Sequence, residues 1–273
     1  MLLLPDCVLD DTLAFFVVSG GDPLRFLNGL CTQDLRALED GEGTTAFVLE
    51  SKGKTIALVR LARVGAAMHA WTERSCAPTL LQHLSKHAAI SGVRVSMELS
   101  PAVRAVTAAG AESQGLHAAQ LCVASAALNN CAFDGPNGVV YRDRAWGVPS
   151  LLVKQRTPLD AHVATLPRVE TLDPWRVDAG VPRYGIDIHA GVLPAESSLE
   201  AEAVSYTKGC YCGQEVVARQ HFLGKPRVRL CKLVAAQPFA PNATPVHTSI
   251  APAIDGNGWC ALALLPSARA SAQ

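Results

Sequence analysis

Short apolar runs of the β type alternate with helix-forming segments through the first hundred residues, which limits the chain to folds that mix strands and helices. The run from Leu13 to Ser19 stops at two glycines, and Asp22 followed by Pro23 then predicts the start of a helix. Two more runs, Thr44 to Glu50 and Thr55 to Leu61, flank a Ser-Lys-Gly-Lys tetrapeptide that is typical of a hairpin turn. We therefore predict an α+β body rather than a doubly wound parallel sheet.

The rest of the chain continues this mixture. A helix is expected over Ala77 to Lys86, with Leu80, Leu81 and Leu84 facing inward, and an Ala-rich element over Ala118 to Leu128. No glycine-rich dinucleotide fingerprint follows any predicted strand, which argues against a nicotinamide or flavin enzyme. The remaining predicted elements are a helix from Asp173 to Gly180 and strands over Ala66–Thr72, Val93–Leu99, Val103–Ala108, Gly138–Tyr141, Arg227–Val234 and Gly258–Leu265.

Composition predicts extensive burial and narrows the functional classes. Apolar residues make up 49% of the 273 residues and charged residues only 18%, below the roughly 25% usual in globular proteins. The formal net charge is zero and no basic stripe is present, which argues against direct nucleic-acid binding. No apolar run approaches the roughly 18 residues of a membrane span, and the N-terminus lacks the basic region of a secretory signal. We expect a cytoplasmic protein that does not bind membranes and keeps its nine cysteines as free thiols.

The segment from Lys208 to Gly224 has the greatest density of reactive groups in the chain. Gly209 and Gly213 permit a tight turn around Cys210, which would hold its thiol at a surface. From Gln214 onward the sequence predicts a short helix that stops at the last glycine of the segment. This stretch is the first candidate for a functional site.

Charges near Cys210 favour its ionised form. The thiol would lie just ahead of a helix N-terminus, near Lys208 and Arg219, and each of these stabilises a thiolate. Glu215 in the first turn suits the helix dipole. The alternative is a buried, inert cysteine in a structural turn, because free cysteine is among the most buried residue types. The residues alone leave both interpretations open.

A built-in metal site is not indicated. Cys210 and Cys212 form a C-x-C pair, but the second pair that a zinc ribbon or finger supplies is missing. His221, Cys231 and His247 follow at spacings that match no zinc template. A disulfide within the C-x-C pair would close a very short, strained loop.

Two other polar pairs have competing interpretations. Lys52 and Lys54 in the predicted hairpin could steer an anionic ligand, although a solvated turn explains them as well. His83 and His87 are four residues apart on a predicted helix and could chelate a metal, but no acidic third ligand is nearby, and a solvated helix face is the simpler explanation.

The run Lys208-Gly209-Cys210-Tyr211-x-Gly213-Gln214-Glu215 resembles the signature of the YgfZ family, folate-binding proteins related to the glycine-cleavage T-protein, an aminomethyltransferase. Cys212 falls on the variable position, so no family role is assigned to it. Two further stretches resemble the same family: Arg176-x-Asp178-x-Gly180-x-Pro182 and Pro194-x-Glu196. The segment from Gly21 to Leu35 is similar to the family's opening.

The resemblance implies a T-protein-like α+β fold, with a ferredoxin-like α+β body and a small C-terminal β-barrel-like module. The expected division places residues 1–99 and 168–225 in a folate-binding body. Residues 100–167 would form a second α+β subdomain, and residues 226–273 a short C-terminal β module.

The resemblance also implies tetrahydrofolate, or a one-carbon-substituted folate, as the cofactor. Its expected contacts are Trp175, Arg176, Asp178 and Glu196. A carboxylate can accept hydrogen bonds from a pterin, and a flat ring can stack on an aromatic side chain. Relatives commonly have Glu where this chain has Asp178, which is one methylene shorter. From the residues alone, a core position is the simpler explanation of Trp175, and Arg176 with Asp178 can be explained as a surface pair.

The expected function is assistance to iron–sulfur cluster assembly or repair in client enzymes, with indirect effects on tRNA modification. The resemblance implies iron–sulfur client or assembly proteins as partners. In this interpretation Cys210 is the reactive thiol, and the residues expected to position or activate it are Lys208, Tyr211, Gln214, Glu215 and Arg219. Two alternatives stay open: a tetrahydrofolate-dependent aminomethyltransferase, although that branch lacks the Lys-Gly-Cys-Tyr motif, and a folate-binding scaffold without an active thiol.

Overall fold

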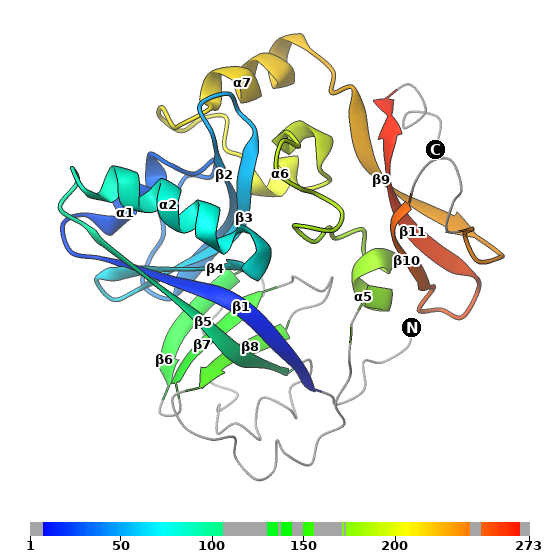
Figure 1. Ribbon diagram of the computed structural model, residues 1–273, viewed down its shortest axis with the longest axis horizontal. Coiled ribbons are helices and arrows are strands. Elements are labelled where there is room, and N and C mark those ends of the chain that lie inside the picture. Colours follow the sequence, from blue (N-terminus) through cyan, green and yellow to red (C-terminus); the bar gives the residue numbers. More distant parts are fainter. Residues whose placement is uncertain are drawn as a thin grey trace.

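Two antiparallel sheets organise the chain (Figure 1). The structure is a computed structural model that describes residues 8–105, 130–135, 138–143, 150–155, 171, 173–240 and 247–267. Eight strands close into a barrel in the order β1-β4-β3-β2-β6-β7-β8-β5, and three more form a separate sheet in the order β10-β11-β9. The barrel strands are β1 (Val8–Ser19), β2 (Glu42–Leu49), β3 (Thr55–Val64), β4 (Ala67–Glu73), β5 (Arg94–Ala105), β6 (Asn130–Gly135), β7 (Gly138–Asp143) and β8 (Ser150–Gln155). The smaller sheet contains β9 (Val228–Ala235), β10 (His247–Pro252) and β11 (Trp259–Pro266).

Helices lie between and beside the sheets. Part of the barrel, β5-β1-β4-β3 with α1 and α2, has the strand order of a ferredoxin-like unit, and α2 crosses one face of these strands (Figure 1). The described helical segments are α1 (Pro23–Asn28), η1 (Arg74–Cys76), α2 (Ala77–Ala88), α5 (Asp173–Asp178), η3 (Pro194–Glu196), α6 (Glu200–Ala203) and α7 (Gln214–Leu223). Among the described residues, no helix has the length and apolar character that crossing a membrane requires.

The strands are apolar on both faces because each face meets a core. Leu13 and Phe15 of β1 pack with Trp71 and Tyr141 in one cluster. Phe16, the next residue of β1, belongs to a larger cluster that also contains residues of α1, α2 and α7. Successive residues of a strand point to opposite faces, so β1 contributes to the barrel interior and to the helix-covered side. This accounts for the high apolar fraction of the sequence.

Most of the locally encoded elements were predicted correctly. The helix after Asp22 is present, and the Asp22 carboxylate accepts a hydrogen bond from the Arg25 backbone N–H at 2.9 Å. The predicted hairpin is β2–β3, and the helix from Gln214 ends at Leu223, directly before Gly224. The predicted α+β mixture of strands and helices is confirmed. Leu80 and Leu84 are buried as predicted, whereas Leu81 is only half-buried.

The strands β6, β8 and β10 were not predicted. β6 pairs with β2, and β8 pairs with β5, so strands from the predicted second subdomain share one closed sheet with the N-terminal strands. The boundaries at 99/100 and 167/168 stay predictions, although β5 itself runs from Arg94 to Ala105. The expected element over Ala118–Leu128 and the end of the Val103–Ala108 strand lie outside the described residues.

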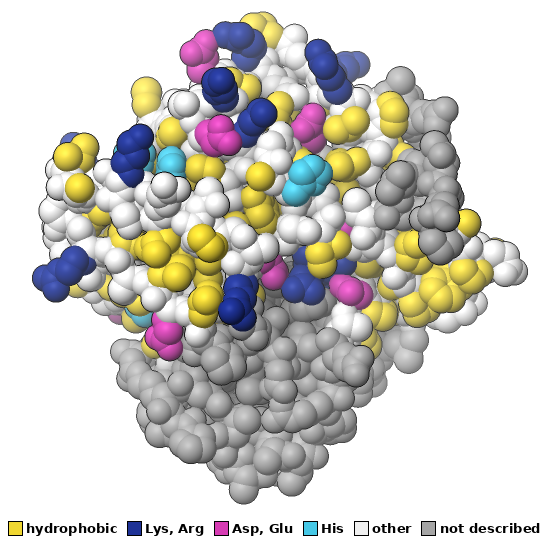
Figure 2. Space-filling model, in the orientation of Figure 1, with side chains coloured by type: hydrophobic (Ala, Val, Ile, Leu, Met, Phe, Trp, Pro, Cys, Tyr) yellow, Lys and Arg dark blue, Asp and Glu magenta, His cyan; other side chains and the backbone are white. Residues whose placement is uncertain are grey.

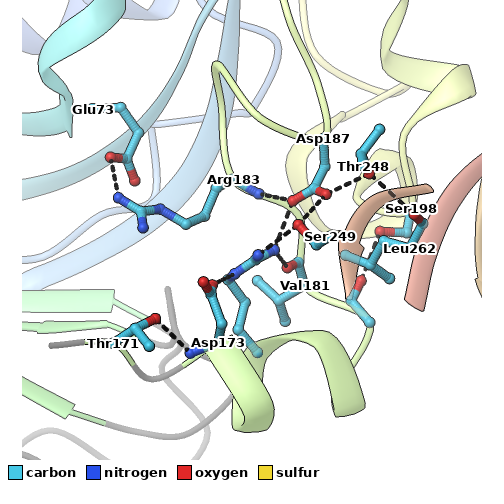
Figure 3. Close-up of polar contacts among 12 residues, drawn as sticks. Glu73, Thr171, Asp173, Val181, Arg183, Asp187, Ser198, Thr248, Ser249 and Leu262 are labelled. Atoms are coloured by element: carbon cyan, nitrogen blue, oxygen red, sulfur yellow. Dashed lines mark hydrogen bonds and ion pairs between the residues drawn. The ribbon is translucent and has the colours of Figure 1, made fainter. Parts of the chain in front are cut away.

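A buried ion pair joins α5 to the smaller sheet. The Arg176 guanidinium donates to the Asp187 carboxylate at 2.6 Å, and both side chains are fully buried. It also donates to Asp173 at 2.8 Å, to the Val181 carbonyl at 2.8 Å and to Ser249 of β10 at 2.8 Å. Asp187 in turn accepts hydrogen bonds from Thr248, Ser249 and the backbone N–H of Arg183 (Figure 3). The network satisfies both charges and fixes the C-terminal sheet against α5.

Replacing Arg176 by Met is expected to destabilise the protein by about 3–5 kcal/mol, because it leaves the Asp187 carboxylate buried without its partner. The free energy of unfolding in urea measures the effect. The exposed Arg219–Glu215 pair is the matched control, and Arg219→Met should cost no more than about 0.5 kcal/mol. Equal losses in the two variants would contradict the role given to the buried pair.

Candidate functional site

Cys210 lies on an exposed turn between two buried anchors. Its side chain is exposed, whereas Lys208 and Tyr211 on either side are 5% and 7% exposed. Tyr211 belongs to the large core cluster that includes residues of the barrel and of α2. The turn is therefore fixed from below while its sulfur faces solvent. This agrees with the surface-turn interpretation of the sequence and not with a buried, inert cysteine.

Lys208 fastens the turn to the last residue of α1 and to the loop that follows it. Its Nζ donates hydrogen bonds to the backbone carbonyls of Asn28 at 2.7 Å, Cys31 at 2.9 Å and Gln33 at 2.6 Å. An ammonium group has three donors, so these contacts use its full capacity. Nζ also lies 5.2 Å from the centroid of the Tyr211 ring. Burial lowers the pKa of Lys208. The structure thus gives Lys208 an architectural task, and its predicted effect on the Cys210 thiol stays a prediction.

Backbone contacts complete the junction of these two segments. The N–H of Cys212 donates to the Gly29 carbonyl at 3.2 Å, and the N–H of Ser205 donates to the Thr32 carbonyl at 2.9 Å. The buried Thr32 hydroxyl donates to the Ala203 carbonyl at 2.6 Å and accepts from the Phe47 N–H at 2.8 Å. Thr32 therefore ties β2 to the chain ahead of the motif, a role for which the sequence offers no local signal.

The β2–β3 hairpin packs against the start of α7, and this contact requires glycine. Gly213 has φ +83°, and a Cβ placed on it would lie 2.6 Å from the Glu50 carbonyl oxygen. A Cβ on Gly53 at the hairpin tip would lie 2.8 Å from the Cβ of Val216. Gly209 has neither constraint, because its φ is not positive and, its chain neighbours aside, no atom of the described residues lies within 4 Å of the Cβ position. Of the two motif glycines, only Gly213 needs the conformational freedom that the sequence analysis gave to both.

The remaining motif residues belong to α7. Gln214 is its first residue and is half-buried. Glu215 and Arg219 form an exposed i,i+4 ion pair at 2.6 Å. The guanidinium of Arg219 is thus directed toward its own helix neighbour, and its predicted influence on Cys210 stays a prediction.

Four of the other described cysteines differ from Cys210 in environment. Cys31 and Cys76 are buried, and burial raises the pKa of each thiol to about 11. Cys212 is half-buried, and partial burial raises its thiol pKa as well. Cys260 is buried, and its thiol donates to the Asp178 carboxylate. No group of three His, Cys, Asp or Glu side chains suited to a metal ion is found in the part of the chain that the structure describes.

The four predicted folate contacts lie in two places. Trp175, Arg176 and Asp178 are on α5, and Glu196 is in η3. The Glu196 carboxylate accepts the Leu193 backbone N–H at 2.9 Å and so closes its own turn. Asp178 accepts from the Lys232 ammonium at 3.0 Å and from the Cys260 thiol at 3.3 Å, both in the smaller sheet.

Trp175 differs from the other three because, in the part of the chain that the structure describes, its buried indole N–H has no hydrogen-bond partner. Arg176 already makes four hydrogen bonds with its five N–H donors. A buried donor without a partner costs about 1–3 kcal/mol, and a bound ligand with an acceptor could satisfy it. Trp175 thus keeps an unused indole donor, whereas Arg176 and Glu196 are largely occupied with internal contacts.

A groove of about 490 Å³ lies beside the motif, between α1 and the end of α2. It meets the motif through Gly29, whose carbonyl accepts the Cys212 N–H. His87 is in its wall, which gives this half of the His83–His87 pair a place at a concave surface. The lining residues are Asp22, Arg25, Phe26, Gly29, Leu30, His87, Ile90 and Ser91.

Replacing Gly213 by Ala should destabilise the protein by about 2 kcal/mol or more, because the new Cβ is strained at positive φ and collides with the Glu50 carbonyl. Thermal and urea unfolding would measure the loss. Gly209→Ala, four positions earlier in the same motif, is the control and should change stability by less than about 0.5 kcal/mol. A stable Gly213→Ala protein would contradict the close contact with the hairpin.

Iodoacetamide at pH 8 is expected to alkylate Cys210 well before Cys31 or Cys76 in the native protein. The raised pKa values of the two buried thiols leave little thiolate until the pH approaches about 11, and burial also excludes the reagent. Peptide mass spectrometry after timed labelling measures the order. In guanidinium chloride the three thiols should react at similar rates, and similar rates in the native protein would contradict the assigned exposure.

Comparisons with known proteins support one family. The chain is 26% identical over 241 residues to the tRNA-modifying protein YgfZ of Yersinia enterocolitica, an alignment that covers 85% of this chain and 71% of the relative. It is 27% identical over 246 residues to the protein of the same name from Vibrio vulnificus, covering 86% and 72%. No protein-family model matches the chain. The crystal structure of the glycine cleavage system aminomethyltransferase T from Bartonella henselae superposes with a TM-score of 0.82 at 16% identity, over 97% of this chain and 79% of that one.

Proposed function

We propose that this chain, which is a homologue of the YgfZ proteins, binds tetrahydrofolate or a one-carbon-substituted folate and supports iron–sulfur cluster assembly or repair in client enzymes. We place this activity in the cytoplasm. The relatives are named tRNA-modifying proteins. An effect of this chain on tRNA modification would be indirect, through the iron–sulfur enzymes that it supports. The zero formal net charge supports an indirect effect rather than direct tRNA binding.

The observation that carries the proposal is the exposed sulfur of Cys210 on a turn held by Lys208 and Tyr211. A cysteine with a purely structural role would not need this exposure. The buried Lys208 ammonium donates to three backbone carbonyls and so holds the loop in place. A cysteine thiolate is the usual protein ligand of iron–sulfur clusters. An accessible thiol in a fixed position can therefore contact iron or a thiol of a docked client without rearrangement of the loop.

The folate component rests on the T-protein-like fold and on Trp175. When bound, a reduced folate supplies one-carbon chemistry. The indole of Trp175 would offer a stacking surface and a donor that has no acceptor among the described residues. Asp178 would offer its carboxylate, which is held in place by Lys232 and Cys260. Arg176 and Glu196 would act by shaping the backbone around these two residues.

Changing Cys210 to Ala should remove most of the ability to restore iron–sulfur enzyme activity in a cluster-defective deletion strain, because the exposed thiol is lost while its anchors remain. The readout is the activity of iron–sulfur enzymes in the complemented strain. Cys212→Ala is the matched control, since this half-buried neighbour occupies the variable motif position, and it should complement like the unchanged protein. Thermal unfolding and tetrahydrofolate binding should be similar in both variants. Full complementation by Cys210→Ala would show that the thiol is not required.

A further inference from the structure

We propose that α7 and the tip of the β2–β3 hairpin form a docking surface for a protein partner whose contact face is acidic and carries apolar side chains. The proposal rests on the proposed function and deepens it by naming where, and to what kind of surface, a client binds. The docking surface is defined by the apolar pair Phe222 and Leu223 and by the basic residues Lys52, Lys54, Arg219, Lys225 and Arg227.

The apolar pair is exposed far beyond what folding requires. Phe222 is 67% and Leu223 is 85% exposed at the end of α7. Phe222 is held in place rather than loose, because it makes edge contacts with the rings of Tyr206 and His221. His221 itself stacks on Tyr206 with ring centroids 3.7 Å apart. A fixed aromatic residue beside an exposed leucine is typical of a binding hot spot.

Basic side chains lie along α7 and beside its first turn. Figure 2 shows Lys and Arg groups gathered along the upper edge of the molecule, over α7 and the β2–β3 hairpin. Lys52 and Lys54 flank Gly53, which packs on Val216, so the hairpin tip lies directly against α7. Among the described residues, neither lysine has an ion-pair partner, and the same is true of Lys225 and Arg227. Free cations on a chain of zero formal net charge favour a partner with complementary carboxylates.

The composition of the surface favours a protein partner over RNA. Leu223 is aliphatic and offers no stacking face to a base, and Glu50 and Glu215 place exposed carboxylates among the cations. A nucleic-acid surface would be expected to form a more continuous basic stripe. Apolar anchors beside charged side chains match the core and rim of a protein interface.

Helix α7 connects the docking surface to the turn that carries Cys210. The helix begins at Gln214, four residues after Cys210, and its ten residues span about 15 Å. A partner seated on Phe222 and Leu223 would therefore lie about one length of α7 away from the turn that carries the exposed thiol. Lys52 and Lys54, which the sequence suggested as either a solvated turn or an anion-steering pair, gain a steering role toward an acidic protein.

Site-specific photocrosslinking in cells tests the surface directly. A photoreactive phenylalanine analogue at position 222 should give protein adducts whose crosslinked peptides are rich in Asp and Glu and contain apolar residues. The same analogue at Val234, which is equally exposed on β9, is the control and should give none of these adducts. Lys52→Glu combined with Lys54→Glu should lower the adduct yield at least fivefold. Absence of protein adducts, adducts removed by ribonuclease, or a yield insensitive to the charge reversal would each overturn the proposal.

A second measurement separates this proposal from the proposed function. Phe222→Ser combined with Leu223→Ser should lower iron–sulfur enzyme activity in the complemented strain at least fivefold, with thermal unfolding and Cys210 alkylation unchanged. Val234→Thr should complement fully. If the double variant complements fully while Cys210→Ala does not, the docking surface is wrong and the proposed function stands. If both complement fully, the proposed function itself fails.

Discussion

The ammonium group of Lys208 is the contact on which the site depends. It joins the turn that carries Cys210 to carbonyls located 175 to 180 residues earlier in the chain. Burying a charge is costly unless hydrogen bonds satisfy it, and here three carbonyl oxygens do so at once. Because these oxygens belong to the last residue of α1 and to the loop after it, the geometry of the motif depends on a distant segment of the chain.

The motif thus contains several residues that anchor the turn and one residue whose side chain is exposed to solvent. Lys208, Tyr211 and Gly213 are constrained by a buried ammonium, a core ring and a close backbone contact. Cys210 is left exposed on top of them. A fixed support limits the conformations of the thiol, so little entropy is lost when a partner engages it. The adjacent helix α7 carries the exposed pair Phe222 and Leu223, the surface that we propose for docking.

Residues that were expected to contact folate also make contacts that stabilise the fold. Arg176 is fully buried and neutralised by Asp187, a residue that no motif singled out. The side chains of Arg176 and Asp178, both in α5, form hydrogen bonds with residues of the smaller sheet. These bonds connect α5 to the C-terminal module. A ligand bound at Trp175 would lie at that connection.

The sequence by itself determined the elements whose signals are local. The cap at Asp22, the hairpin between β2 and β3, and the helix from Gln214 to Leu223 follow from side chains within a few residues of each boundary. Tertiary structure alone decided the closure of the barrel, because β6 and β8 pair with strands far away in sequence and have weak periodicity of their own. It also decided which groups the charged side chains bond to: the partners of Lys208 and Arg176 were set by burial and long-range contacts. Local rules fix where an element begins and ends, whereas the environment of a charged side chain exists only once distant segments have packed.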